Sequence, residues 1–221
     1  MINKSLSIFF ILLLFSCAKD GKNIYVEGRV VNPVTGEGIP NITLDLRKKV
    51  PDPGGSGSDS KTVKTVLSDQ NGYFTIAHNG SLFNSYIIHM SNSNGIGYHV
   101  AGWKDASGTS IGGYNLEVDK GQYMNVRYEL VPYAEFKVDA YNVNCFDQTD
   151  TMLLYKQNQI GSLQEGPWIY PGCNSFLGGY NKVPMGKIYF SWHVIRNGIT
   201  NIYSDTIYLD EGEQETFTIN Y

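Results

Sequence analysis

This 221-residue chain has little cysteine, little positive charge and no long hydrophobic segment. Three cysteines are too few for a disulfide-dense scaffold. The 17 Lys and Arg against 21 Asp and Glu give a formal net charge of −4. Because nucleic-acid binding depends on clustered Lys and Arg, the composition argues against a nucleic-acid partner. The longest apolar run, Leu6 to Phe15, falls well short of the roughly 20 residues that a transmembrane helix needs.

Helical periodicity is also missing after this run. Apolar residues do not repeat every ~3.6 residues over any long stretch. Ala and Leu are sparse, whereas the chain contains 16 Tyr and 24 Gly. Tyr, Thr, Val and Ile favour strands, and Gly and Asn are common in the turns between them. The sequence therefore predicts an all-β protein.

The N-terminal apolar run follows Lys4 and ends at Ser16 and Cys17. A positive residue, a short apolar run and a small residue are the parts of a secretory signal. A Cys directly after the small residue resembles the lipobox of bacterial lipoproteins, in which the chain is cut before the Cys and the thiol is acylated. The resemblance implies a signal peptide over 1–16, a lipidated Cys17 as membrane anchor, and a polar tether over 17–23. An ordinary secreted protein with a chance Cys at this place is the alternative.

The residues after Cys17 bear on where the protein is displayed. Lys19 and Asp20 resemble part of the surface-export signal of Bacteroidota lipoproteins, which usually has more acidic residues. We therefore expect an outer-membrane lipoprotein of the cell envelope. Both a surface-exposed and a periplasm-facing position are compatible with the sequence.

The two remaining cysteines are Cys145 and Cys173. In an oxidising compartment an even pair predicts one disulfide. It would close a loop of about 29 residues and contribute roughly 3 kcal/mol in the chain-entropy model. Two free thiols or a metal pair are the alternatives, although a metal site needs further ligands at short spacing. The histidines have no such spacing, so we expect no metal and no other cofactor; they are His78, His89, His99 and His193.

The segment after the tether contains two motifs of one known family. A Val-x-Gly-x-Val strand is followed by Thr-Gly-x-Gly-Ile-Pro-Asn-Ile and later by Ser-Asp-x-Asn-Gly-x-Phe. Together they resemble the carboxypeptidase regulatory-like domain, whose fold is a transthyretin-like, seven-stranded β-sandwich. The resemblance covers roughly 24–130 and implies a non-catalytic domain over 24–131. The matching residues are Val26, Gly28, Val30, Thr35, Gly36, Gly38, Ile39, Pro40, Ile42, Ser68, Asp69, Gly72 and Phe74.

Local signals place the turns and the end of this first domain. Gly36 falls where a hairpin turn needs positive φ. Residues 69–72 lack the third acidic position and the terminal Glu of an EF-hand, so we interpret them as a tight turn. Residues 51–60, rich in Gly, Ser and Pro, predict a flexible loop inside the domain. A last strand over 122–130 and then Pro132 mark the predicted boundary.

A second β-sandwich is predicted over 132–221. Residues 135–141 and 188–194 alternate in the manner of strands, and Asn197-Gly198 is typical of a hairpin turn. Five or six short strands with regular turn signals indicate an immunoglobulin-like or a second transthyretin-like sandwich. The predicted fold class is therefore two tandem β-sandwich domains after a lipoprotein signal peptide.

No catalytic constellation stands out, and we expect a non-catalytic lipoprotein that acts as a structural or binding module. An outer-membrane uptake or assembly complex would be one setting for it, with a protein partner there. The alternative is a surface carbohydrate-binding lipoprotein that uses Trp168, Tyr170 and Trp103. Aromatic side chains on β-loops stack on sugar faces or anchor protein partners. Packing between the sheets is the other interpretation of the same side chains.

Two short triplets suggest modification. Asp-Thr-Met at Thr151 and Asp-Thr-Ile at Thr206 resemble the O-glycosylation site of Bacteroidota exported proteins. A strand position is the alternative explanation for Thr206.

Overall fold

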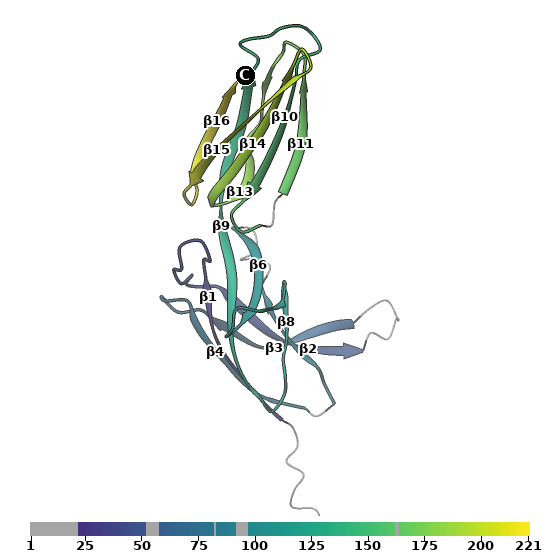
Figure 1. Ribbon diagram of the computed structural model, residues 1–221. Helices are drawn as coiled ribbons and strands as arrows, with labels where there is room; N and C mark the ends of the chain where they lie inside the picture. Colours follow the sequence, from purple (N-terminus) through teal and green to yellow (C-terminus); the bar gives the residue numbers. More distant parts are fainter. Residues whose placement is uncertain (1–21, 52–57, 82, 92–96, 162–163) are drawn as a thin grey trace, which may run out of the picture.

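The computed structural model describes residues 22–51, 58–81, 83–91, 97–161 and 164–221. Every secondary-structure element over these ranges is a β-strand (Figure 1), which confirms the all-β fold class. Over these ranges no helix is long and apolar enough to cross a membrane. The predicted signal peptide, Cys17 and the tether up to residue 21 lie outside the described residues.

Two sheets form a sandwich in the N-terminal half. The strands are β1 (Lys22–Val31), β2 (Thr43–Pro51), β3 (Ser58–Leu67), β4 (Tyr73–Gly80), β5 (Tyr86–Met90), β6 (Tyr98–Asp105), β7 (Ser110–Gly112), β8 (Asn115–Glu117) and β9 (Tyr123–Tyr141). One sheet has the order β4-β1-β9-β6-β7 and the other β3-β2-β5-β8. β1 runs antiparallel to β4 and parallel to β9, so it is central to the first sheet.

The two family-like motifs of this half meet in space. Asp69 Oδ1 accepts the N–H groups of Asn71 and Tyr73, each at 2.8 Å, and Gly72 has φ 82°. This geometry confirms the predicted turn at 69–72. A side chain on Gly38 would collide with the Asn71 carbonyl, so the first turn can lie against the second only with glycine there.

The C-terminal half is likewise built from two sheets, one of which continues the first sheet of the N-terminal half through β9. Its strands are β10 (Thr151–Asn158), β11 (Gln164–Pro171), β12 (Ser175–Leu177), β13 (Asn181–Pro184), β14 (Gly186–Arg196), β15 (Ile199–Leu209) and β16 (Gln214–Asn220). One sheet has the order β11-β10-β14-β15. In the other, β9 pairs in parallel with β16 and antiparallel with β12 and β13. Asn197 and Gly198, with φ 46° and 74°, form the predicted hairpin turn between β14 and β15.

A single strand belongs to both halves. β9 has 19 residues and runs from the N-terminal half into the C-terminal half (Figure 1). The sequence predicted two strands separated at Pro132, and this prediction is wrong. Pro132 lies inside β9, opposite Tyr98, and its carbonyl accepts the N–H of Met185 at 2.8 Å. Proline is tolerated because β9 exchanges partners here: its pairing with β1 ends at Glu129 and its pairing with β16 begins at Glu135.

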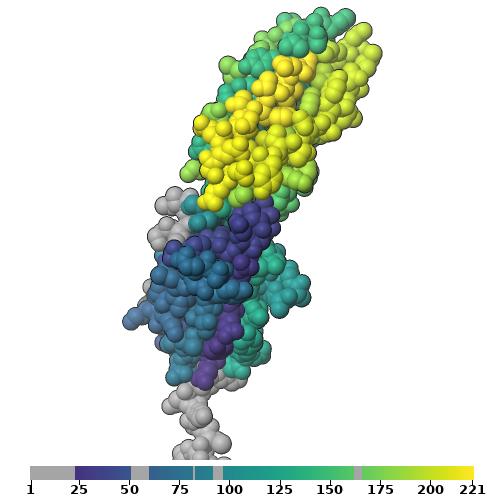
Figure 2. All heavy atoms as spheres, turned by 90° about the vertical axis from the view of Figure 1, so that its left-hand side faces the viewer, coloured from purple at the N-terminus to yellow at the C-terminus, as the bar shows by residue number. Residues whose placement is uncertain are grey.

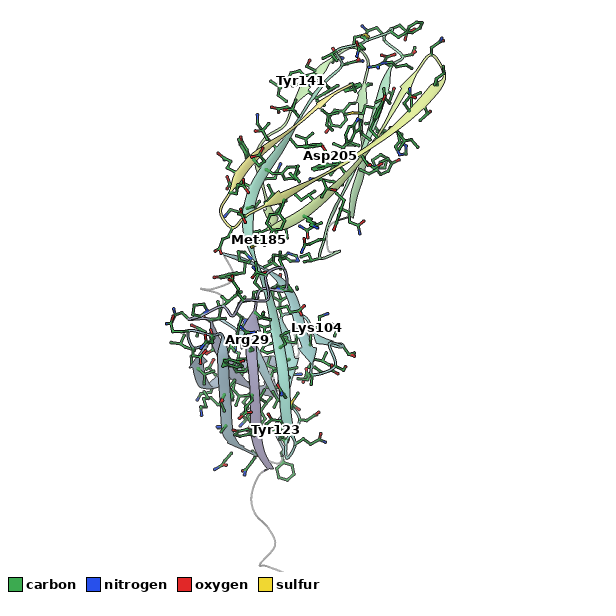
Figure 3. The ribbon with its side chains drawn as sticks, turned by 60° about the vertical axis from the view of Figure 1, so that its left-hand side comes forward. Arg29, Lys104, Tyr123, Tyr141, Met185 and Asp205 are labelled. Atoms are coloured by element: carbon green, nitrogen blue, oxygen red, sulfur yellow. A yellow bond between two sulfur atoms is a disulfide. The ribbon has the colours of Figure 1, made fainter. Side chains whose placement is uncertain are left out.

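Each half has its own hydrophobic core. One cluster of buried side chains draws on residues 24–130 and the other on residues 134–221. The halves also touch beside β9, where the Asn32 amide lies 3.2 Å from the Met185 sulfur. Figure 3 shows Met185 at this junction. That each half is an independent domain stays a prediction.

Candidate binding cleft

Trp103 does not form part of a binding surface. Its side chain is 0% exposed in β6, with its ring stacked on Tyr128 at 4.1 Å between centroids and edge-on to Phe74 at 6.2 Å. Because both neighbours are core residues, no ring face is left for a ligand. The prediction that Trp103 contacts a ligand is therefore wrong, and the packing interpretation holds for this residue.

Trp168 and Tyr170 lie in strand β11 and not in a loop. Both are half-buried and project from the same face of β11, which pairs with β10 so that Trp168 lies opposite Leu154. Burial raises the pKa of the Tyr170 hydroxyl, and the Tyr170 ring meets Phe176 edge-on at 5.0 Å. The strand thus presents two partly accessible aromatic rings from a rigid support.

These two rings line a cleft of about 480 Å³ between the two sheets of the C-terminal half. Its walls are β9, β10, β11, β13 and the connection from β12 to β13. We call it the Trp168 cleft. It is lined by Phe136, Lys137, Val138, Leu154, Lys156, Trp168, Tyr170, Gly178, Gly179, Asn181, Lys182 and Val183.

A lysine lies between two aromatic rings of this cleft. The Lys156 ammonium is 4.4 Å from the Trp168 ring centroid and 4.8 Å from that of Phe136. A cation over a ring face at such a distance is attracted by the ring quadrupole. The contact holds the Trp168 ring in place, and it places a positive charge beside the aromatic wall.

A second lysine belongs to an ion pair at the same wall. Lys137 donates to Asp139 at 2.8 Å, and this hydrogen bond raises the pKa of the Lys137 amine. Asp139 also accepts the N–H of Gly178 at 3.1 Å. A side chain on Gly178 would lie 2.5 Å from the Val138 carbonyl, so glycine is needed for this connection to pack on β9. The connection from β12 to β13 is therefore held against β9 by the Asp139 side chain and by the close approach of Gly178.

The Cys145–Cys173 disulfide is present at the far end of this half, as predicted, with its Cα atoms 5.3 Å apart. Beside it, the buried Asp150 accepts bonds from Arg196 Nε at 3.0 Å, Asn142 at 3.2 Å and the Phe146 N–H at 3.0 Å. Burial opposes ionisation of Asp150, but these donors outweigh it and lower the pKa of its carboxyl group. The sequence did not predict this cluster, because Arg196 lies 46 residues after Asp150 and the short spacing of Asn142, Phe146 and Asp150 matches no known motif.

A second cleft, of about 420 Å³, lies on the outer face of β4, β1 and β9. Within it the Glu27 carboxylate accepts the hydroxyl groups of Tyr25 at 2.6 Å and Tyr123 at 2.7 Å. These two hydrogen bonds lower the pKa of Glu27. Figure 3 shows Arg29 and Tyr123 along this face. The lining contains two acidic and two basic side chains, so the cleft displays no excess of one sign; they are Glu27, Asp105, Arg29 and Arg127.

The two predicted O-glycosylation residues both lie in strands. Thr151 is half-buried at the start of β10, and its hydroxyl donates to the Thr149 carbonyl at 3.3 Å. Thr206 is exposed in β15, where its N–H donates to the Asp205 carboxylate at 2.7 Å. Glycosylation at either residue stays a prediction.

The sequence also contains one pattern that is typical of a catalytic serine. Gly108 to Gly112 has the Gly-x-Ser-x-Gly pattern of a nucleophile elbow, with Ser110 at its centre. The elbow requires a strand, a sharp turn and a helix. Ser110 instead begins β7 in an exposed hairpin with β6, so the pattern lacks its structural context. In the part of the chain that the structure describes, no three His, Cys, Asp or Glu residues gather as metal ligands.

No family model and no curated protein matches this chain. Among solved structures it is similar to the minor pilin GBS52 of Streptococcus agalactiae, at 8% identity and a TM-score of 0.33 over 89% of this chain and 94% of that one. A streptococcal ancillary pilin is 13% identical, with a TM-score of 0.30 over 91% of this chain and 63% of that one. The shaft pilin SpaA of Lactobacillus rhamnosus GG is 8% identical, with a TM-score of 0.28 over 90% of this chain and 97% of that one. At these values the likeness carries no argument about function.

Proposed function

We propose that this chain is a non-catalytic lipoprotein of the cell envelope in which a rigid arm holds a binding surface away from the membrane. The observation that carries the proposal is β9, one strand shared by both halves. A hinge between two domains needs a linker that bends, and a strand paired on both sides of the junction resists bending. The two halves therefore move together.

The position of the chain's start supports the same arrangement. β1 begins at Lys22 at the lower end of the molecule, far from the C-terminal half (Figure 1). With Cys17 acylated only five positions earlier, the N-terminal half faces the membrane and the Trp168 cleft lies at the distal half. The several acyl chains of such an anchor hold a protein to the membrane for long periods.

Intact mass and protease accessibility test this proposal together. Protein extracted from membranes should begin at an acylated Cys17, and a Cys17→Ser variant should lose both the added mass and the membrane association. Protease treatment of whole cells then separates surface display from a periplasmic position. An unmodified N-terminus on membrane-extracted protein would rule out the anchored arm.

Glycan binding at the Trp168 cleft is a second candidate function. Its specific support is that Trp168 and Tyr170 present half-buried rings side by side on one strand, next to the Lys156 ammonium. Sugar rings stack on such aromatic faces, and lysine and asparagine side chains donate to hydroxyl groups.

Tryptophan fluorescence tests the second candidate. Titration with soluble glycans should change the emission of the wild-type chain, and Trp168→Ala should abolish the response. Tyr189→Ala is the matched control, because Tyr189 is an exposed aromatic residue of β14 that does not line the cleft. Unchanged emission across a broad glycan panel would exclude this function and leave the rigid arm unaffected.

A further inference from the structure

The strand β15 is a long, open edge of a sheet. It has 11 residues and pairs with β14 over 11 consecutive residue pairs without a register shift. Among the described strands it pairs with no other, so its second side is an edge. In Figure 2 the yellow-green atoms of β15 lie at the margin of the C-terminal half. Such an edge presents unpaired N–H and C=O groups to any strand that approaches it.

The opposite edge of the same sheet is protected, and β15 is not. β11 contains Pro167 and Pro171, and its pairing with β10 shifts register between Leu154 and Lys156. Proline and bulges are the usual devices that stop a sheet edge from pairing. β15 has neither, and Asp205 is its single charged residue. One sheet thus carries a blocked edge and an open one.

We propose that β15 pairs antiparallel with β15 of a second copy of this chain, about a two-fold axis at Ser204. The two four-stranded sheets then join edge to edge into one sheet. The proposal rests on the edge itself and does not depend on acylation of Cys17 or on the Trp168 cleft.

The residue pattern of β15 fits this self-pairing. The odd-numbered residues Ile207 and Leu209 face the core, and the even-numbered ones face outward. Directly opposite residues of an antiparallel pair share a face, so odd must meet odd and even must meet even. The register centred on Ser204 meets this condition and overlaps all 11 residues, because Ile199 then lies opposite Leu209.

The same register also avoids charge repulsion. Like charges directly opposite one another destabilise a strand pair. A register centred on Asp205 would bring the two carboxylates together, whereas the register centred on Ser204 places each Asp205 opposite Tyr203 of the other copy. Ile202 lies opposite Thr206 and Thr200 opposite Tyr208, so no charged side chain lies in the rows of the outer face. A glycan on Thr206 would cover this edge, so the unglycosylated chain is the form to measure.

A cysteine trap tests the register. Opposed residues in an antiparallel pair have Cα atoms about 4.5–5.5 Å apart, which suits a disulfide. Ser204→Cys, in the chain from residue 18 onward, should therefore cross-link to itself under mild oxidation. Thr200→Cys is the control, because its two copies would lie about 26 Å apart along the strand. Both substitutions are at exposed positions of β15, so folding is preserved.

A matched pair of lysine variants tests whether the β15 edge forms the contact between the two copies. Ile202, 66% exposed on β15, and Ile169, 63% exposed on β11, lie in one row across the sheet through His193 and Leu153. Sedimentation of the wild-type chain should show a dimer. Ile202→Lys should raise the dissociation constant roughly tenfold or more, whereas Ile169→Lys should leave it unchanged.

Three results would each overturn the proposal. One is a wild-type chain that stays monomeric up to about 1 mM. Another is cross-linking of Thr200→Cys as rapid as that of Ser204→Cys, which would indicate random collision. The third is an equal effect of the two lysine variants, which would place the contact on the face of the sheet and not at its β15 edge.

Discussion

At the residue scale, Trp103 and Trp168 have opposite surroundings, although both were predicted from the sequence to contact a ligand. Trp103 is enclosed between Tyr128 and Phe74, whereas Trp168 keeps part of its ring accessible beside Lys156. Both follow a glycine-rich stretch, and neither the composition nor the spacing separates them. What separates them is the neighbouring strand: β6 pairs with the central strand β9, and β11 is the edge of its sheet.

Replacing Trp103 should therefore cost stability. Truncation of a large buried aromatic side chain loses its burial and leaves a cavity, so Trp103→Ala should lower the free energy of unfolding by about 3–5 kcal/mol. Denaturant unfolding measures the change. Trp168→Ala, at a half-buried position, is the control and should cost clearly less; the reverse order would contradict the assignment of the two rings.

The buried Asp150 predicts a pH dependence at the residue scale. Its folded-state pKa is lowered by Phe146, Asn142 and Arg196, which outweigh the effect of burial. A carboxyl group whose pKa is lowered on folding stabilises the protein above its unfolded pKa of about 3.9, and this contribution is lost as the pH falls through the folded value.

Asp150→Asn tests this contribution. At neutral pH the variant should be less stable than the wild type, because the amide carries no charge to pair with Arg196. The difference should shrink as the pH falls from about 4 through the lower folded-state pKa, because the wild-type carboxylate loses its charge over this range. Urea denaturation at several pH values measures it. Asp210→Asn, at an exposed residue, should show neither effect; a pH-independent difference for Asp150→Asn would argue against the ion pair.

At the element scale, local patterns were sufficient for the turns and for most strands. The Asp69 turn and the Asn197-Gly198 hairpin depend on residues adjacent in sequence, and both were predicted. The continuity of β9 through Pro132 was not predicted. A proline interrupts a strand only where a partner strand needs its N–H, and the sequence does not show which partner lies there. The contrast between the β11 and β15 edges depends on sheet order, which is a property of distant contacts.

The shared strand β9 predicts a fixed distance between the two halves. Spin labels at Thr75→Cys in β4 and Thr218→Cys in β16, both exposed, should give one narrow distance distribution in pulsed electron paramagnetic resonance. A label pair within the C-terminal half, at Thr200→Cys and Thr218→Cys, sets the width expected for a rigid body. A distribution much broader than that control would show that the junction bends.

At the scale of the whole molecule, the proposed anchor and the proposed pairing edge lie in different halves. β1 begins at one end of the molecule, and β15 lies in the half at the other end (Figure 1). A two-fold axis at Ser204 reverses the second copy, because the paired strands are antiparallel. The N-terminal halves of the pair then extend in opposite directions, and their anchors suit two facing membranes better than one.

Vesicles test this geometry, which requires both the acylated Cys17 and the β15 pairing. Vesicles that carry the acylated chain should cluster and scatter more light. Ile202→Lys should leave them dispersed, whereas Ile169→Lys, in the same row of the sheet, should cluster them as the wild type does. Acylated Ser204→Cys should cross-link only when the vesicles are in contact. Dispersed wild-type vesicles, combined with a dimer of the unacylated chain in solution, would show that the membrane-bound copies cannot reach the antiparallel arrangement.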